Sequence, residues 1–195
     1  MGRRHLSLAL LTEGASDQWF LVPLIDRQVA GIALEASVGF DYSGVVAGEC
    51  YTVAHRDLVL REVTDLLHYF DIVLIHHDHN ERSKAEAIRE RVPGDAHRIV
   101  PLVPVRETEA WMLADREALK ESAPTRDAAG KAPRDVQKIA DPKAMLKTAL
   151  GGRRDAEHDF ARLGQTVALE ALSLVPAYRR WTAELRQAME RLRFL

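Results

Sequence analysis

Apolar residues in the first 105 positions alternate between short continuous runs and helix-like spacing. The continuous runs predict four strands, at residues 5–12, 32–40, 71–77 and 98–105. Apolar residues spaced three and four apart predict helices between them, over about 17–30, 54–69 and 83–91. Such alternation is typical of a parallel sheet covered by helices. We therefore expect an α/β fold, with a mainly parallel four-stranded sheet flanked by helices, over residues 1–118.

Helical spacing continues after the fourth predicted strand, but no further strand pattern follows. We expect helices at residues 107–120, 142–150, 156–163, 165–174 and 177–193. Residues 119–195 are therefore predicted to form an all-helical C-terminal region packed on the core. Within the core, Gly39, Gly44 and Gly48 predict a flexible loop. Prolines in the fourth strand predict that it lies near a sheet edge or ends early.

Composition narrows the class of protein. The 195 residues are 47% hydrophobic and 29% charged, which is typical of a globular domain. The net charge of −2 provides no overall positive field for nucleic acid, so such a role would need a local patch or a partner chain. Cys50 is the only cysteine, which excludes an intramolecular disulfide and a cysteine-based zinc cluster. No apolar run reaches the length of a membrane span, and we expect a cytoplasmic protein.

Acidic residues follow three of the predicted strands at the point where each strand ends. Because the carboxyl ends of parallel strands share one edge, we expect their carboxylates to lie within roughly 10 Å of each other. Oxygen-rich groups of this kind suit Mg²⁺ or Mn²⁺. The residues concerned are Glu13 after the first strand, Asp78, Asn80 and Glu81 after the third, and Glu107 and Glu109 after the fourth.

Other interpretations of the same residues stay open at this point. An acid after a strand is commonly a turn residue or a helix cap. The stretch HHDHN is also similar to the His/Asp mixtures of zinc or di-metal hydrolases, but His97 and His158 lack the spacing that those sites need. His76 and His77 point to opposite faces of a strand, so we expect one of them to be a packed histidine rather than a ligand.

Three segments taken together resemble a known superfamily. TEGASDQWFL, IVLIHHDHNERS and VPVRETEAWMLAD are similar to motifs of the TOPRIM superfamily, and within it to a small bacterial TOPRIM-like family of undefined function (the DUF4276 type). That family has an acidic Asp-x-Asp after its central strand, whereas this chain has Asp78-His79-Asn80. A second register would place His76 and Asp78 at the two acidic positions. We prefer the first register because Asp78 lies where the strand should end.

The resemblance implies phosphoryl transfer on nucleic acid, by a phosphodiester hydrolase that uses Mg²⁺ or Mn²⁺. It implies catalytic roles for Glu13, Asp78 and Glu109, and metal ligation by those three with Asn80 and Glu107. Supporting residues would be Asp17, His77, His79 and Glu81. Candidates for binding phosphate are Arg82, Lys84, Arg106, Lys131 and Lys143.

The resemblance also implies a partner and leaves other functions open. The chain lacks a P-loop motif, so we expect a separate ATPase as partner, together with nucleic acid. The amide of Asn80 removes one negative charge from the expected metal shell, so Asn80→Asp is predicted to tighten metal binding. The alternatives are a catalytically inactive metal-binding or nucleic-acid-binding subunit, and a hydrolase or transferase that acts on free nucleotides.

Overall fold

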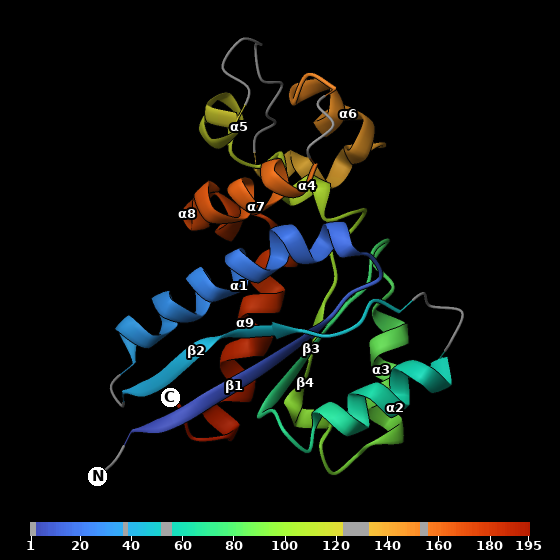
Figure 1. Cartoon of the computed structure of the whole chain (residues 1–195), viewed down its shortest axis with the longest axis vertical. Coiled ribbons are helices and arrows are strands. Elements are labelled where there is room, and N and C mark those ends of the chain that lie inside the picture. The colour runs from blue at the N-terminus through green and yellow to red at the C-terminus, as the bar shows by residue number, and fades with distance from the viewer. Residues whose placement is uncertain (1–2, 37–38, 52–55, 123–132, 153–155) are drawn as a thin grey trace.

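A computed structural model describes residues 3–36, 39–51, 56–122, 133–152 and 156–195, and its centre is a four-stranded sheet (Figure 1). All pairings between neighbouring strands are parallel, in the order β2-β1-β3-β4. The strands are β1 (Arg4–Leu11), β2 (Phe40–Ala47), β3 (Ile72–His76) and β4 (Ile99–Leu102). The prediction of an α/β fold with a parallel sheet is confirmed, and the proline-containing fourth strand does lie at an edge.

Helices flank this sheet and form the described part of the chain after β4. Those between the strands are α1 (Ala15–Glu35), α2 (Arg56–Leu66), α3 (Arg82–Arg91) and the short 3₁₀ helix η1 (Ala96–Arg98). Those after β4 are α4 (Glu109–Met112), α5 (Arg116–Ser122), η2 (Pro133–Lys138), α6 (Pro142–Ala149), α7 (Ala156–Thr166), α8 (Leu169–Ser173) and α9 (Pro176–Arg191). Among the described residues beyond 120 there is no strand, as predicted.

The two faces of the sheet bury two separate apolar clusters. Ile72 and Leu74 of β3 belong to the larger cluster, which includes α1 and α9. Val73 and Ile75 belong to the smaller cluster, which includes α2 and α3. Alternation along β3 therefore sends successive side chains to opposite layers, and the two layers of helices are visible in Figure 1.

The second strand was placed wrongly by the sequence analysis. Residues 32–35 belong to α1, and β2 begins only at Phe40. Ile32 is buried in the core, but Leu34 is 90% exposed, so the apolar run is one helical turn rather than a strand. Gly44 was assigned to a flexible loop and lies instead inside β2. Its positive φ of 106° accompanies a shift in the pairing of β2 with β1, which is a conformation that glycine adopts without strain.

The C-terminal helices pack directly on the α/β core. A side chain at Gly164 of α7 would clash with the main chain of α1, since its Cβ would lie 2.3 Å from the carbonyl oxygen of Phe20. Arg27 of α1 also donates a hydrogen bond to the carbonyl oxygen of Gly164 (2.9 Å). The predicted helix over 107–120 is two short helices, because Asp115 accepts hydrogen bonds from the first amides of α5. The division at residue 118 stays a prediction.

None of the described helices has the length and apolar character that crossing a membrane requires.

Candidate metal centre

His76, the last residue of β3, is surrounded by polar groups although it is 1% exposed. Its Nε2 lies 2.9 Å from the hydroxyl of Thr108 and 3.3 Å from Oδ1 of Asp78. Its Nδ1 lies 4.0 Å from Oδ2 of Asp17. One possible ligand atom from each of Asp17, His76 and Asp78 lies within 4.8 Å of the other two. We call these three residues the acidic triad.

The loop after β3 holds Asp78 in place through backbone hydrogen bonds. The amides of His79 and Asn80 donate to the carbonyl oxygens of Arg106 (2.5 Å) and Pro104 (2.9 Å), so the loop is tied to the segment that follows β4. His79 and Asn80 both adopt left-handed conformations with φ of 56°. Asparagine tolerates the left-handed region of backbone conformation better than most residues. The left-handed conformation of these two residues lets the chain turn directly after Asp78.

Asp17 reaches the triad from the first turn of α1. Its amide donates to the carbonyl oxygen of Gly14 (3.2 Å), and its side chain is buried against His76. Burial raises the pKa of Asp17, and the neighbouring Asp78 raises it further, although the positive charge of His76 opposes this shift. From the sequence we expected only a supporting role for Asp17. In the structure it is one of the three residues whose possible ligand atoms lie within 4.8 Å of one another.

Thr108 joins all three members of the triad. Its amide donates to Oδ1 of Asp78 (3.2 Å), and its hydroxyl contacts His76. A hydrogen bond from its side chain also lowers the pKa of Asp17. Thr108 is 1% exposed, so these contacts are shielded from water. The sequence analysis missed it because a threonine between two glutamates carries no chemical signal of its own.

The carboxylates decide the charge of His76. Burial alone lowers the pKa of this imidazole, but the hydrogen bond to Asp78 and the charges of Asp17, Asp78 and Glu13 outweigh burial and raise it. The same contact acts on Asp78 in reverse: burial raises its pKa, but His76 and Lys143 bring the net pKa below the ordinary value. Without a bound cation, the raised pKa of His76 favours the imidazolium, whose charge opposes those of the two carboxylates.

Glu109 and Lys143 lie beside the triad. Burial raises the pKa of Glu109 to about 7, and the charges of Asp17 and Asp78 contribute to the rise. Lys143 of α6 places its Nζ 3.5 Å from Oε1 of Glu107 and 4.0 Å from Oε1 of Glu109. Burial lowers the pKa of Lys143, but these carboxylates raise it overall. The third predicted group of acids therefore lies at the same edge of the sheet as Asp78.

Glu13 lies on the other side of the strand end. Its Oε1 is 3.3 Å from Nδ1 of His77, the residue that faces the α2–α3 layer. Burial lowers the pKa of His77, and this single carboxylate does not reverse the effect. The charge of Glu13 also acts on His76, so the two sides are electrostatically connected. The predicted catalytic role of Glu13 stays a prediction.

The remaining predicted residues surround the site without entering the triad. His79, Asn80 and Arg106 are exposed. Glu81 forms an ion pair with Lys84, and Arg82 forms one with Glu184 (2.7 Å). Lys131 lies outside the described residues.

The register that matches the family motif stays a prediction. His76 and Asp78 lie in the triad, whereas the preferred register had used Asp78 and Asn80. Strand alternation was the signal that could have found His76, because it shares a face with Leu74 and hence with α1. The ligand role of Asn80 stays a prediction.

Protein-family models, curated proteins and solved structures were compared with the chain, and none of them matches. The TOPRIM resemblance therefore stays a prediction.

The triad and its neighbours fit a divalent cation. Nδ1 of His76 and Oε2 of Glu109 are buried and have no hydrogen-bond partner among the described residues. Buried polar atoms without partners are costly and call for an explanation, and a bound cation would provide one. Two carboxylates with an imidazole are ligands that Mn²⁺ accepts readily, while a purely oxygen-based shell would suit Mg²⁺ better.

Proposed function

We propose that the chain is a metal-dependent phosphodiester hydrolase whose cation is held by Asp17, His76 and Asp78. The observation that carries the proposal is this buried triad at the carboxyl ends of parallel strands, the edge at which α/β folds bind their ligands. The imidazole favours Mn²⁺ over Mg²⁺ as the working ion. A bound divalent ion would polarise a phosphate oxygen and lower the pKa of water.

Thr108 positions the ligands in this proposal. A metal ligand works best when a further hydrogen bond fixes its orientation. The hydroxyl of Thr108 fixes the ring of His76, and its amide fixes one oxygen of Asp78. Both ligands are therefore oriented before a cation arrives, which reduces the entropy that binding would otherwise cost.

A groove beside the triad supports a phosphate substrate. It has a volume of about 470 Å³, and its basic residues are His79, Arg106, Lys143 and Lys147. Arg106 and Lys147 form no ion pair with another described residue, and both are exposed. Lys143 lies between the groove and Glu109. Glu107 and Asp141 also line the groove, but Arg106, Lys143 and Lys147 outnumber them and would contact the phosphates of a substrate.

Glu109 is the proton carrier of the proposal. A pKa of about 7 leaves it partly protonated at neutral pH, which is where a general acid or base works best. Its Oε2 is buried and has no hydrogen-bond partner among the described residues. A partner ATPase remains part of the proposal, because the chain has no phosphate-binding loop of its own.

The test is hydrolysis by the purified protein with Mn²⁺ of three substrates: bis(p-nitrophenyl) phosphate, single-stranded DNA and nucleoside triphosphates. Asp78→Asn should abolish hydrolysis, while Asp65→Asn, an equivalent change on the exposed side of α2, should not. If no Mn²⁺-dependent hydrolysis occurs, the proposal is wrong. Hydrolysis of triphosphates alone would favour the nucleotide-hydrolase alternative.

A further inference from the structure

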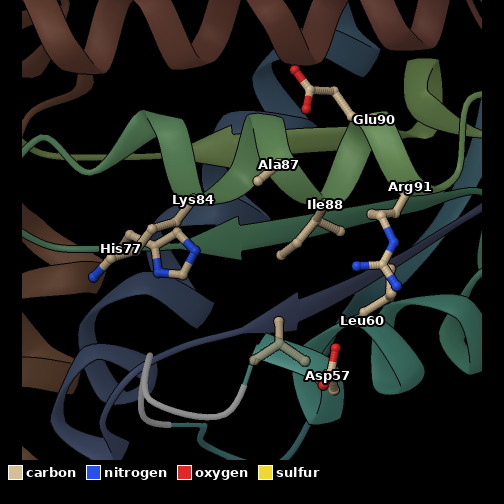
Figure 2. Close-up of a pocket in the computed structure, with 9 residues that line it drawn as sticks. Asp57, Leu60, His77, Lys84, Ala87, Ile88, Glu90 and Arg91 are labelled. Atoms are coloured by element: carbon tan, nitrogen blue, oxygen red, sulfur yellow. The ribbon is translucent and has the colours of Figure 1, made fainter.

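A second cavity lies on the opposite face of the sheet, between α2 and α3 (Figure 2). Its volume is about 230 Å³. Val59 and Leu60 of α2 form one apolar wall, and Ala87 and Ile88 of α3 form the other. Cavities that bind drug-sized molecules are typically somewhat larger, so this one suits a small ring system between two apolar walls.

One end of the cavity is closed by His77 (Figure 2). The carboxylate of Glu13 lies 3.3 Å from Nδ1 and can only accept a hydrogen bond, so this contact places a ring hydrogen on Nδ1 and favours Nε2 as an acceptor. This Nε2 is buried and has no hydrogen-bond partner among the described residues. His77 is 5% exposed, so water does not readily replace the missing partner. An acceptor in this position calls for a donor from a ligand.

The other end is marked by Arg91, whose guanidinium points to the cavity in Figure 2. Arg91 forms no ion pair with another described residue, whereas Lys84, which also lines the cavity, is paired with Glu81. Glu90 also lines the cavity, although its carboxylate points away from the space between α2 and α3 in Figure 2. Asp57 lines the cavity as well and would repel a second negative charge. The charges therefore suit a ligand with one negative charge, such as a carboxylate, better than a phosphate.

We propose that this cavity binds a small aromatic carboxylate that carries a ring N–H. The ring lies between the walls of α2 and α3, the N–H donates to Nε2 of His77, and the carboxylate pairs with Arg91. The proposal is independent of the hydrolase function, because none of the triad residues lines the cavity.

Indole-3-acetate is the probe for this site, because it has the bicyclic ring, the N–H and a single carboxylate. Binding is measured by saturation-transfer NMR and by calorimetric titration of the whole chain. Ala87→Phe fills the cavity from the partly exposed side of α3 and should abolish binding. Arg91→Gln should weaken it by about tenfold, the usual effect of losing one charge-assisted hydrogen bond. Arg61→Gln, the same change at an exposed position of α2 outside the cavity, should leave it unchanged.

Two analogues test the separate contacts. 3-Methylindole lacks the carboxylate, and 1-naphthaleneacetate lacks the N–H, so each should bind several-fold more weakly than indole-3-acetate. No saturation transfer to indole-3-acetate at about 1 mM would overturn the proposal. Equal binding by Ala87→Phe would place the probe elsewhere and would also overturn it. Equal affinity for 3-methylindole, with no effect of Arg91→Gln, would show that the carboxylate is not recognised.

Discussion

His76 and His77 are consecutive and buried, yet they lie in opposite environments. His76 faces Asp17 and Asp78, and its pKa is raised. His77 faces Glu13 on the other layer of helices, and its pKa is lowered. Burial lowers the pKa in both cases, but at His76 three carboxylates outweigh it, whereas at His77 the charges of His76 and Lys84 oppose the single carboxylate of Glu13. A single step along a strand therefore separates a histidine with a raised pKa in the acidic triad from one with a lowered pKa beside an apolar cavity.

This difference has a consequence for metal binding. In the absence of a cation, the raised pKa of His76 favours an imidazolium beside the carboxylates of Asp17 and Asp78. A metal ligand must be deprotonated, so an arriving ion has to displace this proton. Binding at the triad should therefore release protons and weaken as the pH falls. His77, which is neutral and lies outside the triad, should contribute nothing to this dependence.

The largest expected effect is the loss of metal binding on the His76 side. Asp78→Ala removes one ligand and the hydrogen-bond acceptor for Thr108, so we expect Mn²⁺ affinity to fall by more than about 100-fold. His77→Gln, a change of the adjacent side chain on the other face, should leave the affinity unchanged. Calorimetric titration of Mn²⁺ into the three proteins measures both. Equal losses in the two variants would mean that the faces are not functionally distinct.

The next largest expected effect is that of Glu109→Gln on the free energy of unfolding of the metal-free protein. Its pKa rises from 4.5 to about 7 on folding. The contribution of Glu109 to the free energy of unfolding is therefore fully present below pH 4.5 and is lost as the pH rises through 7. The reason is that the ionised carboxylate is poorly solvated in the folded protein. Glu109→Gln cannot ionise and should be more stable than the wild type by up to about 3 kcal/mol at pH 8, with little difference at pH 4.

Urea denaturation in the presence of a chelator at pH 4, 6 and 8 measures this difference. Glu117→Gln, an exposed glutamate on α5, is the matched control and should show no pH-dependent gain. A constant difference between Glu109→Gln and the wild type at all three pH values would contradict a raised pKa.

The two histidines should also give opposite pH dependence to the free energy of unfolding. The pKa of His76 in the folded protein lies above 6.5. Its contribution to the free energy of unfolding is therefore present below pH 6.5 and is lost as the pH rises through the folded pKa. The folded pKa of His77 lies below 6.5, so the folded state loses stability as the pH falls from 6.5 through that pKa. His76→Gln should therefore flatten the alkaline side of the stability profile, and His77→Gln the acidic side. Chemical denaturation between pH 5 and 9 would contradict the comparison if both variants changed the same side.

Much of the fold could be predicted because its signals are local. Continuous apolar runs found β1, β3 and β4, and their order along the chain implied a parallel sheet with acids at one edge. The second strand was misplaced because Leu34, at 90% exposure, looked like part of a buried run. Gly44 looked like a loop because the bulge that uses its positive φ depends on pairing with β1.

The site was harder to predict because it depends on contacts between distant segments. Asp78 and Glu109 were found from their places after strands. Asp17 and His76 were undervalued, since only the packing of α1 on one face of β3 brings them together. Thr108 was missed, because its role comes from contacts with Asp78 and His76 that no sequence pattern records.

The smallest expected effect concerns Asn80, which distinguishes the two registers of the family motif. Asn80 is exposed, and its left-handed conformation is one that aspartate also tolerates, so Asn80→Asp should fold normally. Its added charge lies outside the triad and acts on the ion through water. Because such interactions are weak and screened by salt, Mn²⁺ affinity should rise by less than about threefold and the gain should vanish at about 0.5 M salt. Calorimetric titration at low and high salt measures it. A gain above about tenfold that persists at high salt would mean that position 80 contacts the ion directly, and Asp78 with Asn80 would then be the correct register.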